Sequence, residues 1–332
     1  MQVTTPAMTR LTRQAPAWDR AASRLQQQGA LIALIVLILA GWWRYGDNGF
    51  VSTYNVTSAL RYNAMFALIA LGMTFVIMTG GIDLSVGGVV VLCSILAALW
   101  SPLGLWPATL GAVAGGIIVG LFNGGLVAWL GIQPFIVTLA TLLAARGLSL
   151  VLADNASVSV DFASSFLQLD RKVAGVPMAV LIAALAYLVG SIVLNLTRFG
   201  RHVLAIGGSE EAARLAGLPV PRTLVCVYAV SGGLAGLTGA ILAAQTFTGN
   251  PTEAVGWELS AIAAVVVGGT LLTGGVGSVW TTLVGVLLLG LIINMLNFEN
   301  LDPYWQTMIR GLFLLVVIIL QRRLVRWRDP NR

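Results

Sequence analysis

One carboxylate stands in the middle of a long apolar stretch, GMTFVIMTGGIDLSVGGVVV at residues 72–91. Asp83 is the only charged residue between Arg61 and Trp100, and two pairs of glycines flank it. Glycine lets the backbone leave a helix. A broken helix in a bilayer exposes N–H and C=O groups, which only protein or a water-filled cavity can satisfy. The pattern therefore predicts a polar path for a solute through an apolar environment.

Asp83 itself has two further interpretations. A carboxylate beside the free N–H groups of a helix start is well placed electrostatically, so Asp83 could simply cap the next helix. It could also lie at the cytoplasmic membrane surface, because the preceding span can end near Gly80. We therefore expect Asp83 to shape the path more than to bind the solute.

Neutral polar residues occur on or near other apolar segments. They could hydrogen-bond a hydroxylated solute, although bonding between helices is the commoner use. Neither a row of carboxylates for protons or sodium nor an arginine ladder is present, so the pattern favours a neutral polar cargo over an ion. The candidate pathway and helix-break residues are Gly80, Gly81, Asp83, Ser85, Asn63, Asn123, Gln245 and Asn294.

The residues needed for metal or hydrolytic chemistry are scarce. His202 is the only histidine, and Cys93 and Cys226 both lie in apolar runs. A bound transition metal and a disulfide framework are therefore not expected. A convergent set of His, Asp and Ser is also missing, so an intramembrane enzyme is a weak alternative.

Composition identifies the solvent that surrounds these residues. The 332-residue chain is 58% hydrophobic and 10% charged, with a mean hydropathy of +0.89. A soluble domain carries about a quarter charged residues. Such a chain is too apolar to form a polar shell, and long apolar runs indicate a membrane protein. The net charge of +6 is therefore not a sign of nucleic-acid binding.

The fold class predicted is an all-α integral membrane protein with about ten transmembrane helices, some broken or re-entrant. A span needs about 20 apolar residues. The segment 258–272 looks too short to cross alone. The candidate spans are 30–44, 61–79, 84–100, 106–130, 134–153, 176–197, 223–245, 258–272, 277–298 and 303–321.

Arginine clusters before the first span, between the sixth and seventh, and after the last fall on one side if the number of spans is even. The positive-inside rule then places both termini in the cytoplasm. We expect a cytoplasmic segment at 1–29, a transmembrane domain at 30–321 with a loop at 198–222, and a basic cytoplasmic tail at 322–332. Arg146 could snorkel to the outer face, and Arg310 needs a partner inside the membrane.

Two glycine-rich breaks are loosely alike. GGIDLSVGG at 80–88 and GGTLLTGGVG at 268–277 each interrupt an apolar run in their own half of the chain. This likeness hints at a repeated architecture with broken helices near the middle of the membrane.

The loop between the sixth and seventh spans contains a short helix signal, SEEAARLAG at 209–217. Ser209 is a good N-cap, and acidic residues favour the first turn. Gly217 ends the helix, and prolines follow. This capped helix could be a rigid knob for another protein, or it could lie on the membrane surface. The residues of this candidate contact surface are Ser209, Glu210, Glu211, Ala212, Ala213, Arg214, Leu215 and Gly217.

These motifs resemble the permease subunits of bacterial ABC sugar importers, the family of ribose, arabinose, xylose and galactose permeases. The loop is similar to the family's coupling loop, except that Ser209 stands where Asn is usual. The glycine-rich segment at 72–88, PFIVTLATLLAARGLSLV at 134–151 and VVVGGTLLTGGVGSV at 265–279 also match, and the likeness covers residues 55–322. With NFENLDPYWQTMIRG at 297–311, the chain looks most like one permease of a galactofuranose importer.

The resemblance implies an inner-membrane location and several partners: a second permease, of a different sequence in the galactofuranose type, a cytoplasmic ATPase and a periplasmic sugar-binding protein. The resemblance also implies that the ATPase would hold ATP and Mg²⁺ and would contact this chain at the coupling residues between Ser209 and Gly217. The sequence agrees, because a Walker A loop needs G-x-x-x-x-G-K-[ST], and the only lysine, Lys172, stands between Arg171 and Val173. We expect no cofactor and no enzymatic activity in this chain. An ion-coupled sugar carrier, or an ABC permease for amino acids, remains an alternative.

Overall fold

The computed structural model describes residues 17–302, 304–309, 311–312, 315–316 and 319. Side chains are described from residue 29 onward. Within this part of the chain, eight helices are long and apolar enough to cross a membrane. They are α1 (Ala17–Tyr45), α2 (Thr53–Met78), α3 (Val86–Trp100), α4 (Leu105–Leu130), α5 (Pro134–Leu152), α6 (Met178–Leu196), α9 (Val220–Thr246) and α11 (Val279–Phe298).

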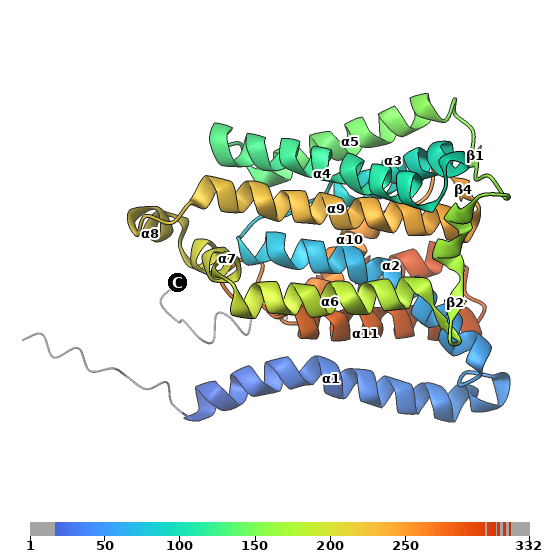
Figure 1. Ribbon diagram of the computed structural model, residues 1–332. Helices are drawn as coiled ribbons and strands as arrows, with labels where there is room; N and C mark the ends of the chain where they lie inside the picture. The colour runs from blue at the N-terminus through green and yellow to red at the C-terminus, as the bar shows by residue number, and fades with distance from the viewer. Residues whose placement is uncertain (1–16, 303, 310, 313–314, 317–318, 320–332) are drawn as a thin grey trace, which may run out of the picture.

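The spanning helices lie side by side, with short elements at both ends (Figure 1). We call the end that carries α7 (Arg198–Gly208) and α8 (Glu210–Leu215) the inner end, and the opposite end the outer end. At the outer end, β1 (Val158–Ser159) pairs antiparallel with β4 (Thr248–Gly249), and β2 (Lys172–Val173) pairs with β3 (Val176–Pro177). The 3-10 helices are η1 (Gly46–Asn48), η2 (Ser101–Leu103) and η3 (Ser165–Asp170).

Local signals explain where the helices begin and end. The Ser52 hydroxyl accepts a 3.2 Å hydrogen bond from the Asn55 amide and caps α2. Gly131 closes α4 with φ +67°, and Pro134 then occupies the first turn of α5, where a missing N–H costs nothing. The tight link between α4 and α5 follows directly from this Gly-to-Pro spacing.

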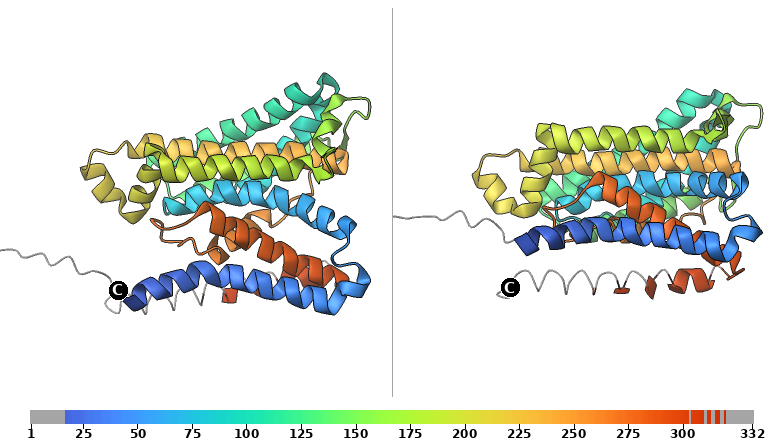
Figure 2. Two further views of the ribbon diagram at one scale, coloured as in Figure 1. Left: turned by 60° about the horizontal axis from the view of Figure 1, so that its bottom comes forward. Right: turned by 90° about the horizontal axis from the view of Figure 1, so that it is seen from below.

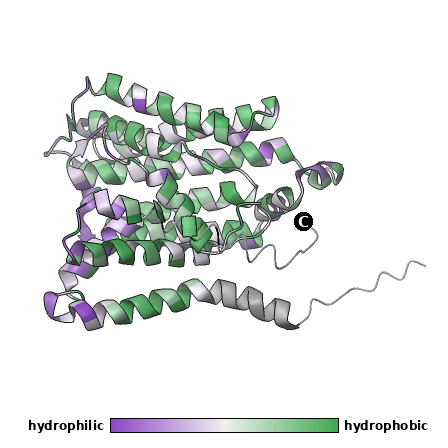
Figure 3. Ribbon diagram, turned by 180° about the vertical axis from the view of Figure 1, so that it is seen from behind, coloured by the Kyte–Doolittle hydropathy of each residue, from purple (hydrophilic) through white to green (hydrophobic). Residues whose placement is uncertain are grey.

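Helices α2, α3 and α9 form the buried centre, and α4, α5 and α6 present apolar side chains outward. Along α2, every residue from Asn63 to Met78 is buried. By contrast, Ile118 on α4, Leu143 on α5 and Leu185 on α6 are each more than 60% exposed. Figure 3 shows the apolar character of these outer helices. Such surfaces suit contact with lipid.

Helices α4 and α9 approach each other backbone to backbone. A Cβ placed at Gly116 or Gly120 would overlap the carbonyl oxygens of Gly232 and Tyr228 on α9. Small residues at this spacing allow the close contact on which helix association in lipid depends. The pair therefore forms a rigid wall beside the buried centre.

Helix α1 lies at the periphery alongside α11 (Figure 2). Aromatic contacts fasten the outer ends of these helices, because the Tyr45 ring stacks on Phe298 with centroids 5.3 Å apart. The Tyr45 hydroxyl also donates a 2.6 Å hydrogen bond to Glu299. Helix α1 is described from Ala17 onward, so polar residues well before the expected residue 30 are also helical.

The eighth expected span is built from two pieces. Helix α10 (Trp257–Val267) has 11 residues, about 16 Å of helix, or half the thickness of the hydrocarbon core. The non-helical residues after it reach the inner end, where the Gly275 amide donates a 2.9 Å hydrogen bond to the Met78 carbonyl. The expectation that 258–272 does not cross as a helix alone is therefore confirmed.

The tenth expected span, 303–321, falls partly outside the described residues. Those of its residues that the structure describes, 304–309, 311–312, 315–316 and 319, are helical. Arg310 lies outside the described residues.

Candidate functional sites

The residues around Asp83 form a buried polar knot. Asp83 is 1% exposed. Its Oδ1 accepts hydrogen bonds from the amide and hydroxyl of Ser85 at 3.0 and 2.5 Å, and its Oδ2 accepts one from Ser231 at 2.8 Å. Asn123 donates to the Ser85 hydroxyl at 2.9 Å and accepts from Thr141 at 2.6 Å. The knot therefore joins the break before α3 to α4, α5 and α9.

This geometry corrects two interpretations of Asp83. It does not lie at a membrane surface, because it is buried and contacts Ser231 in the middle of α9. It also does not cap α3, because that helix begins at Val86 and the carboxylate binds the amide of Ser85, before the first turn. Both carboxylate oxygens accept hydrogen bonds within the protein, so the knot positions helices.

The two glycine-rich breaks meet at the inner end. Gly80 has φ +84° and ends α2, with its amide bonded to Ile77 at 2.9 Å. A Cβ at Gly274 would stand 2.8 Å from the Gly80 amide nitrogen. One at Gly207 of α7 would overlap both the Met78 carbonyl and the Gly275 amide. The segments that look alike in sequence are thus packed against each other and against α7.

Gly81 lies beside a second buried group. A Cβ at this position would stand 2.6 Å from the Tyr228 hydroxyl. That hydroxyl has no hydrogen-bond partner among the described residues. Gly81 thus allows α9 to pack closely against the break.

Helix α8 is the short helix expected from SEEAARLAG. The Ser209 hydroxyl accepts a 3.2 Å hydrogen bond from the Ala212 amide, Arg214 pairs with Glu210 at 2.6 Å, and Gly217 has φ +75°. Leu215 is 85% exposed. Helix α7, which precedes α8, was not expected from the sequence.

One residue that was expected on the contact surface of α8, Ala213, is buried. Ala212, Leu215 and Ala216 are exposed, and so are Glu210 and Glu211. Ala213 is buried against a cluster that contains Ile206 of α7 and Val220 and Leu224 of α9. Ala213 therefore anchors α8 to the bundle and is not part of its outer surface.

Asn63 and Asn294 come together at a cavity between α2 and α11 near the outer end. Its volume is about 610 Å³, and amide side chains of Asn55, Asn63, Asn294, Asn297 and Gln306 line it. A second cavity of about 200 Å³ shares part of this lining and extends along α10. Of the eight residues predicted for the pathway and breaks, Asn63 and Asn294 line this cavity.

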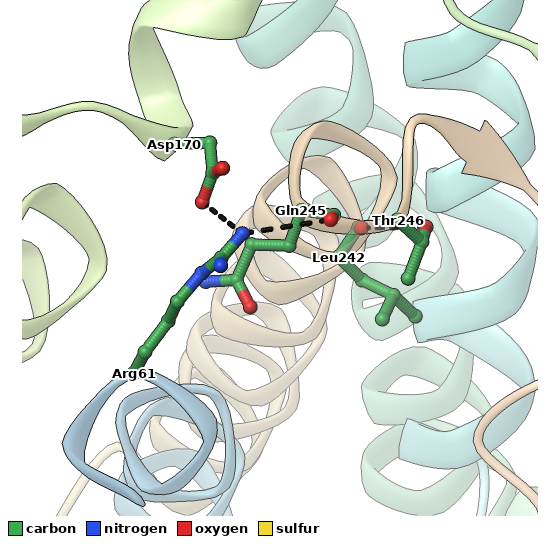
Figure 4. A network of polar contacts seen from close by, with 5 residues as sticks. All are labelled: Arg61, Asp170, Leu242, Gln245 and Thr246. Atoms are coloured by element: carbon green, nitrogen blue, oxygen red, sulfur yellow. Dashed lines mark hydrogen bonds and ion pairs between the residues drawn. The ribbon is translucent and has the colours of Figure 1, made fainter. Parts of the chain in front are cut away.

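Gln245 lies apart from the other candidates, at the outer end of α9 (Figure 4). Its carbonyl accepts a 3.5 Å hydrogen bond from Arg61, which also pairs with Asp170 of η3. Burial raises the pKa of the Asp170 carboxyl, and the charge of Arg61 opposes this effect. Gln245 thus belongs to a set of polar contacts that joins α2, α9 and the loop that carries η3.

Glu258 was not expected from the sequence. This residue lies in the first turn of α10 and is 9% exposed, and a Cβ at Gly87 of α3 would overlap its carboxylate. Arg146 of α5 donates a 3.2 Å hydrogen bond to the neighbouring Ala254 carbonyl, which corrects the expectation that it snorkels outward. The signal available was a carboxylate at the first position of an apolar segment that was too short to span.

Comparisons with known proteins agree with this architecture. Residues 55–318 match the family model described as branched-chain amino acid transport system / permease component. The chain is 38% identical to the ribose import permease protein RbsC of Bacillus subtilis (strain 168), over 90% of this chain and 94% of the relative. No solved structure shows a significant match.

Two further relatives differ in the solute that their names give. The chain is 35% identical to the L-arabinose transport system permease protein AraH of Escherichia coli (strain K12), over 89% of this chain and 90% of the relative. It is 33% identical to the D-allose transport system permease protein AlsC of the same strain, over 87% and 90%. With several membrane-crossing helices and a family match over most of its length, this chain belongs to the branched-chain amino acid transport system / permease component family of multi-pass membrane permeases.

Proposed function

We propose that this chain is the transmembrane subunit of an ATP-driven importer and carries a monosaccharide. The observation that carries the proposal is the way α7 and α8 pack at the inner end of the bundle. Helix α8 offers an exposed outer face, while Gly207 of α7 lies directly against the backbone of both membrane breaks. A displacement of α8 would therefore be transmitted to the two breaks through the backbone contacts of α7.

The mechanism follows from this connection. ATP and Mg²⁺ bind to a separate cytoplasmic ATPase, whose closure moves α8. The movement tilts α7 and α9 and switches the breaks between two packings, which opens the path toward alternate sides. Such a device is a two-state element that is biased by a ligand bound to a partner.

A neutral sugar suits the described cavity better than an amino acid does. The residues that line the cavity of about 610 Å³ are amides, a serine, an isoleucine, small residues and rings, without a charged side chain among the described ones. An amino acid carries two charges, which would need partners inside the membrane. The names of the ribose, arabinose and allose relatives support the same choice.

We further propose a galactofuranose-type assembly: a second permease of different sequence, an ATPase and a periplasmic sugar-binding protein. The motif at residues 297–311 supports this finer assignment. The exposed face of α8, from Ser209 to Gly217, is the proposed contact with the ATPase.

Purification of the tagged chain from its native membrane tests the assembly. We expect a second permease, an ATPase and a binding protein to co-purify. Vesicles that hold this complex should take up a monosaccharide only with ATP inside. Uptake by the chain alone, driven by a proton or sodium gradient, would instead establish an ion-coupled carrier.

A further inference from the structure

The cavity between the outer ends of α2 and α11 has the chemistry of a solute site. Its volume of about 610 Å³ lies within the range of roughly 300–1,000 Å³ that is typical of small-molecule sites. Rings of Tyr62 and Phe298 also line it. Amides can donate and accept hydrogen bonds, and rings cover apolar faces, so this combination suits a ring-shaped molecule with many hydroxyl groups.

The amides are held in place by a defined network. Asn55 and Asn294 exchange hydrogen bonds of 3.2 and 2.8 Å across the gap between α2 and α11. Asn55 also donates to the Phe50 carbonyl at 2.7 Å. Gln306 donates to Asn297 at 2.8 Å. Positioned amides of this kind fix the orientation of a ligand without a large ordering cost.

Asn63 stands where this cavity meets the narrower one beside α10. Both cavities are lined by Tyr62, Asn63, Gly290 and Ile293. The Asn63 Nδ2 donates to Ala59 at 2.8 Å, whereas its Oδ1 accepts no hydrogen bond from the described residues. A Cβ at Gly290 would overlap this oxygen. The missing side chain at position 290 therefore makes room for an acceptor at the junction.

We propose that these two cavities form a binding site for a neutral polyhydroxylated solute within this subunit, with Asn63 Oδ1 accepting a hydroxyl proton of the solute at the narrow junction. The solute class rests on the proposed function, whereas the location rests on the cavity itself.

A thiol placed in the cavity tests its location. Ser58 lines the wide part, and the S58C variant would be made in a chain whose Cys93 and Cys226 are replaced by alanine. The matched control is S157C, an exposed position before β1 at the same end of the bundle. Vesicles holding the assembled importer would be treated with a bulky, membrane-impermeant maleimide. ATP-driven uptake of radiolabelled D-galactose, D-ribose, L-arabinose and D-allose would then be measured.

We expect modification of S58C to lower uptake at least tenfold and modification of S157C to leave it unchanged. Unchanged uptake by fully modified S58C would overturn the proposed location while leaving the importer function intact. If the unmodified importer takes up none of the four sugars, the proposed function fails together with the solute class.

A second arm tests Asn63. N63A should lower uptake at least fivefold at normal abundance in the membrane. N195A, which removes an exposed amide bonded to Ser191 within α6, should leave uptake unchanged. Equal uptake by the two variants would overturn the assignment of Asn63 as an acceptor for the solute.

Discussion

The Gly275 amide donates a 2.9 Å hydrogen bond to the Met78 carbonyl. This bond joins the end of α2 to the non-helical segment after α10, so the two breaks in the membrane helices share one contact. Gly207 of α7 packs directly on this hydrogen bond, and a side chain at position 207 would overlap both of its partners. Helix α7, which precedes the proposed ATPase contact α8, is therefore in direct backbone contact with both breaks.

Replacing Gly207 with alanine tests this contact between α7 and the two breaks. The added Cβ would overlap the Met78 carbonyl and the Gly275 amide, so α7 must move away from the breaks. We expect G207A to reduce ATP-driven uptake at least tenfold. The control is G208A at the next position, where a Cβ meets nothing within 4 Å. Equal uptake by G207A and G208A would contradict the proposed transmission through α7.

An arginine at Ala212 tests the outer face of α8. Ala212 is exposed, so the new side chain is tolerated by the fold but obstructs a partner. We expect A212R to abolish uptake while the purified protein keeps its thermal stability and its elution volume. Normal uptake by this variant would exclude α8 as the coupling contact.

The neighbouring position gives the opposite expectation. Ala213 is 4% exposed, and an uncompensated buried charge costs roughly 3–5 kcal/mol. A213R should therefore lower the yield of folded protein in the membrane, as measured by size-exclusion chromatography. If A213R instead accumulates normally and only transport is lost, Ala213 would belong to the outer surface.

The Asp83 knot should respond to the loss of its carboxylate. In D83A, the amide of Ser85 and the hydroxyl of Ser231 lose the oxygens that accept from them. A buried unmatched donor costs about 1–3 kcal/mol, and the thermal midpoint should fall accordingly. D47A, at an exposed carboxylate in η1, is the control. Equal midpoints for the two variants would show that the knot contributes nothing to stability.

Much of the fold was predictable from apolar run length. The runs that became α4, α5 and α11 were placed to within two residues, because proline, glycine and loss of hydropathy mark their ends. The capped helix α8 was predictable for the same reason, since its Ser209 and Gly217 signals are local.

The parts that escaped prediction depend on neighbours distant in sequence. Asp83 bonds to Ser231, 148 residues away, and hydropathy cannot distinguish a helix face in lipid from one in the protein core, since both are apolar. The same ambiguity hid the burial of Ala213. The solute site needs Asn55 and Asn294 side by side, and only the packing of α2 on α11 brings them together.

The ion pair between Arg61 and Asp170 at the outer end should make the stability of the protein depend on pH. Burial raises the pKa of the Asp170 carboxyl above the ordinary range of an aspartate, although Arg61 lies beside it. The folded state therefore binds this proton more tightly than the unfolded state does. The contribution of Asp170 to stability is then fully present below about pH 4 and is lost as the pH rises through the raised value. We expect the thermal midpoint of the native chain to fall relative to that of D170N over this range. D154N, at an exposed carboxylate of the same end, should show no such relative change, and a difference between the native chain and D170N that stays constant with pH would contradict the raised pKa.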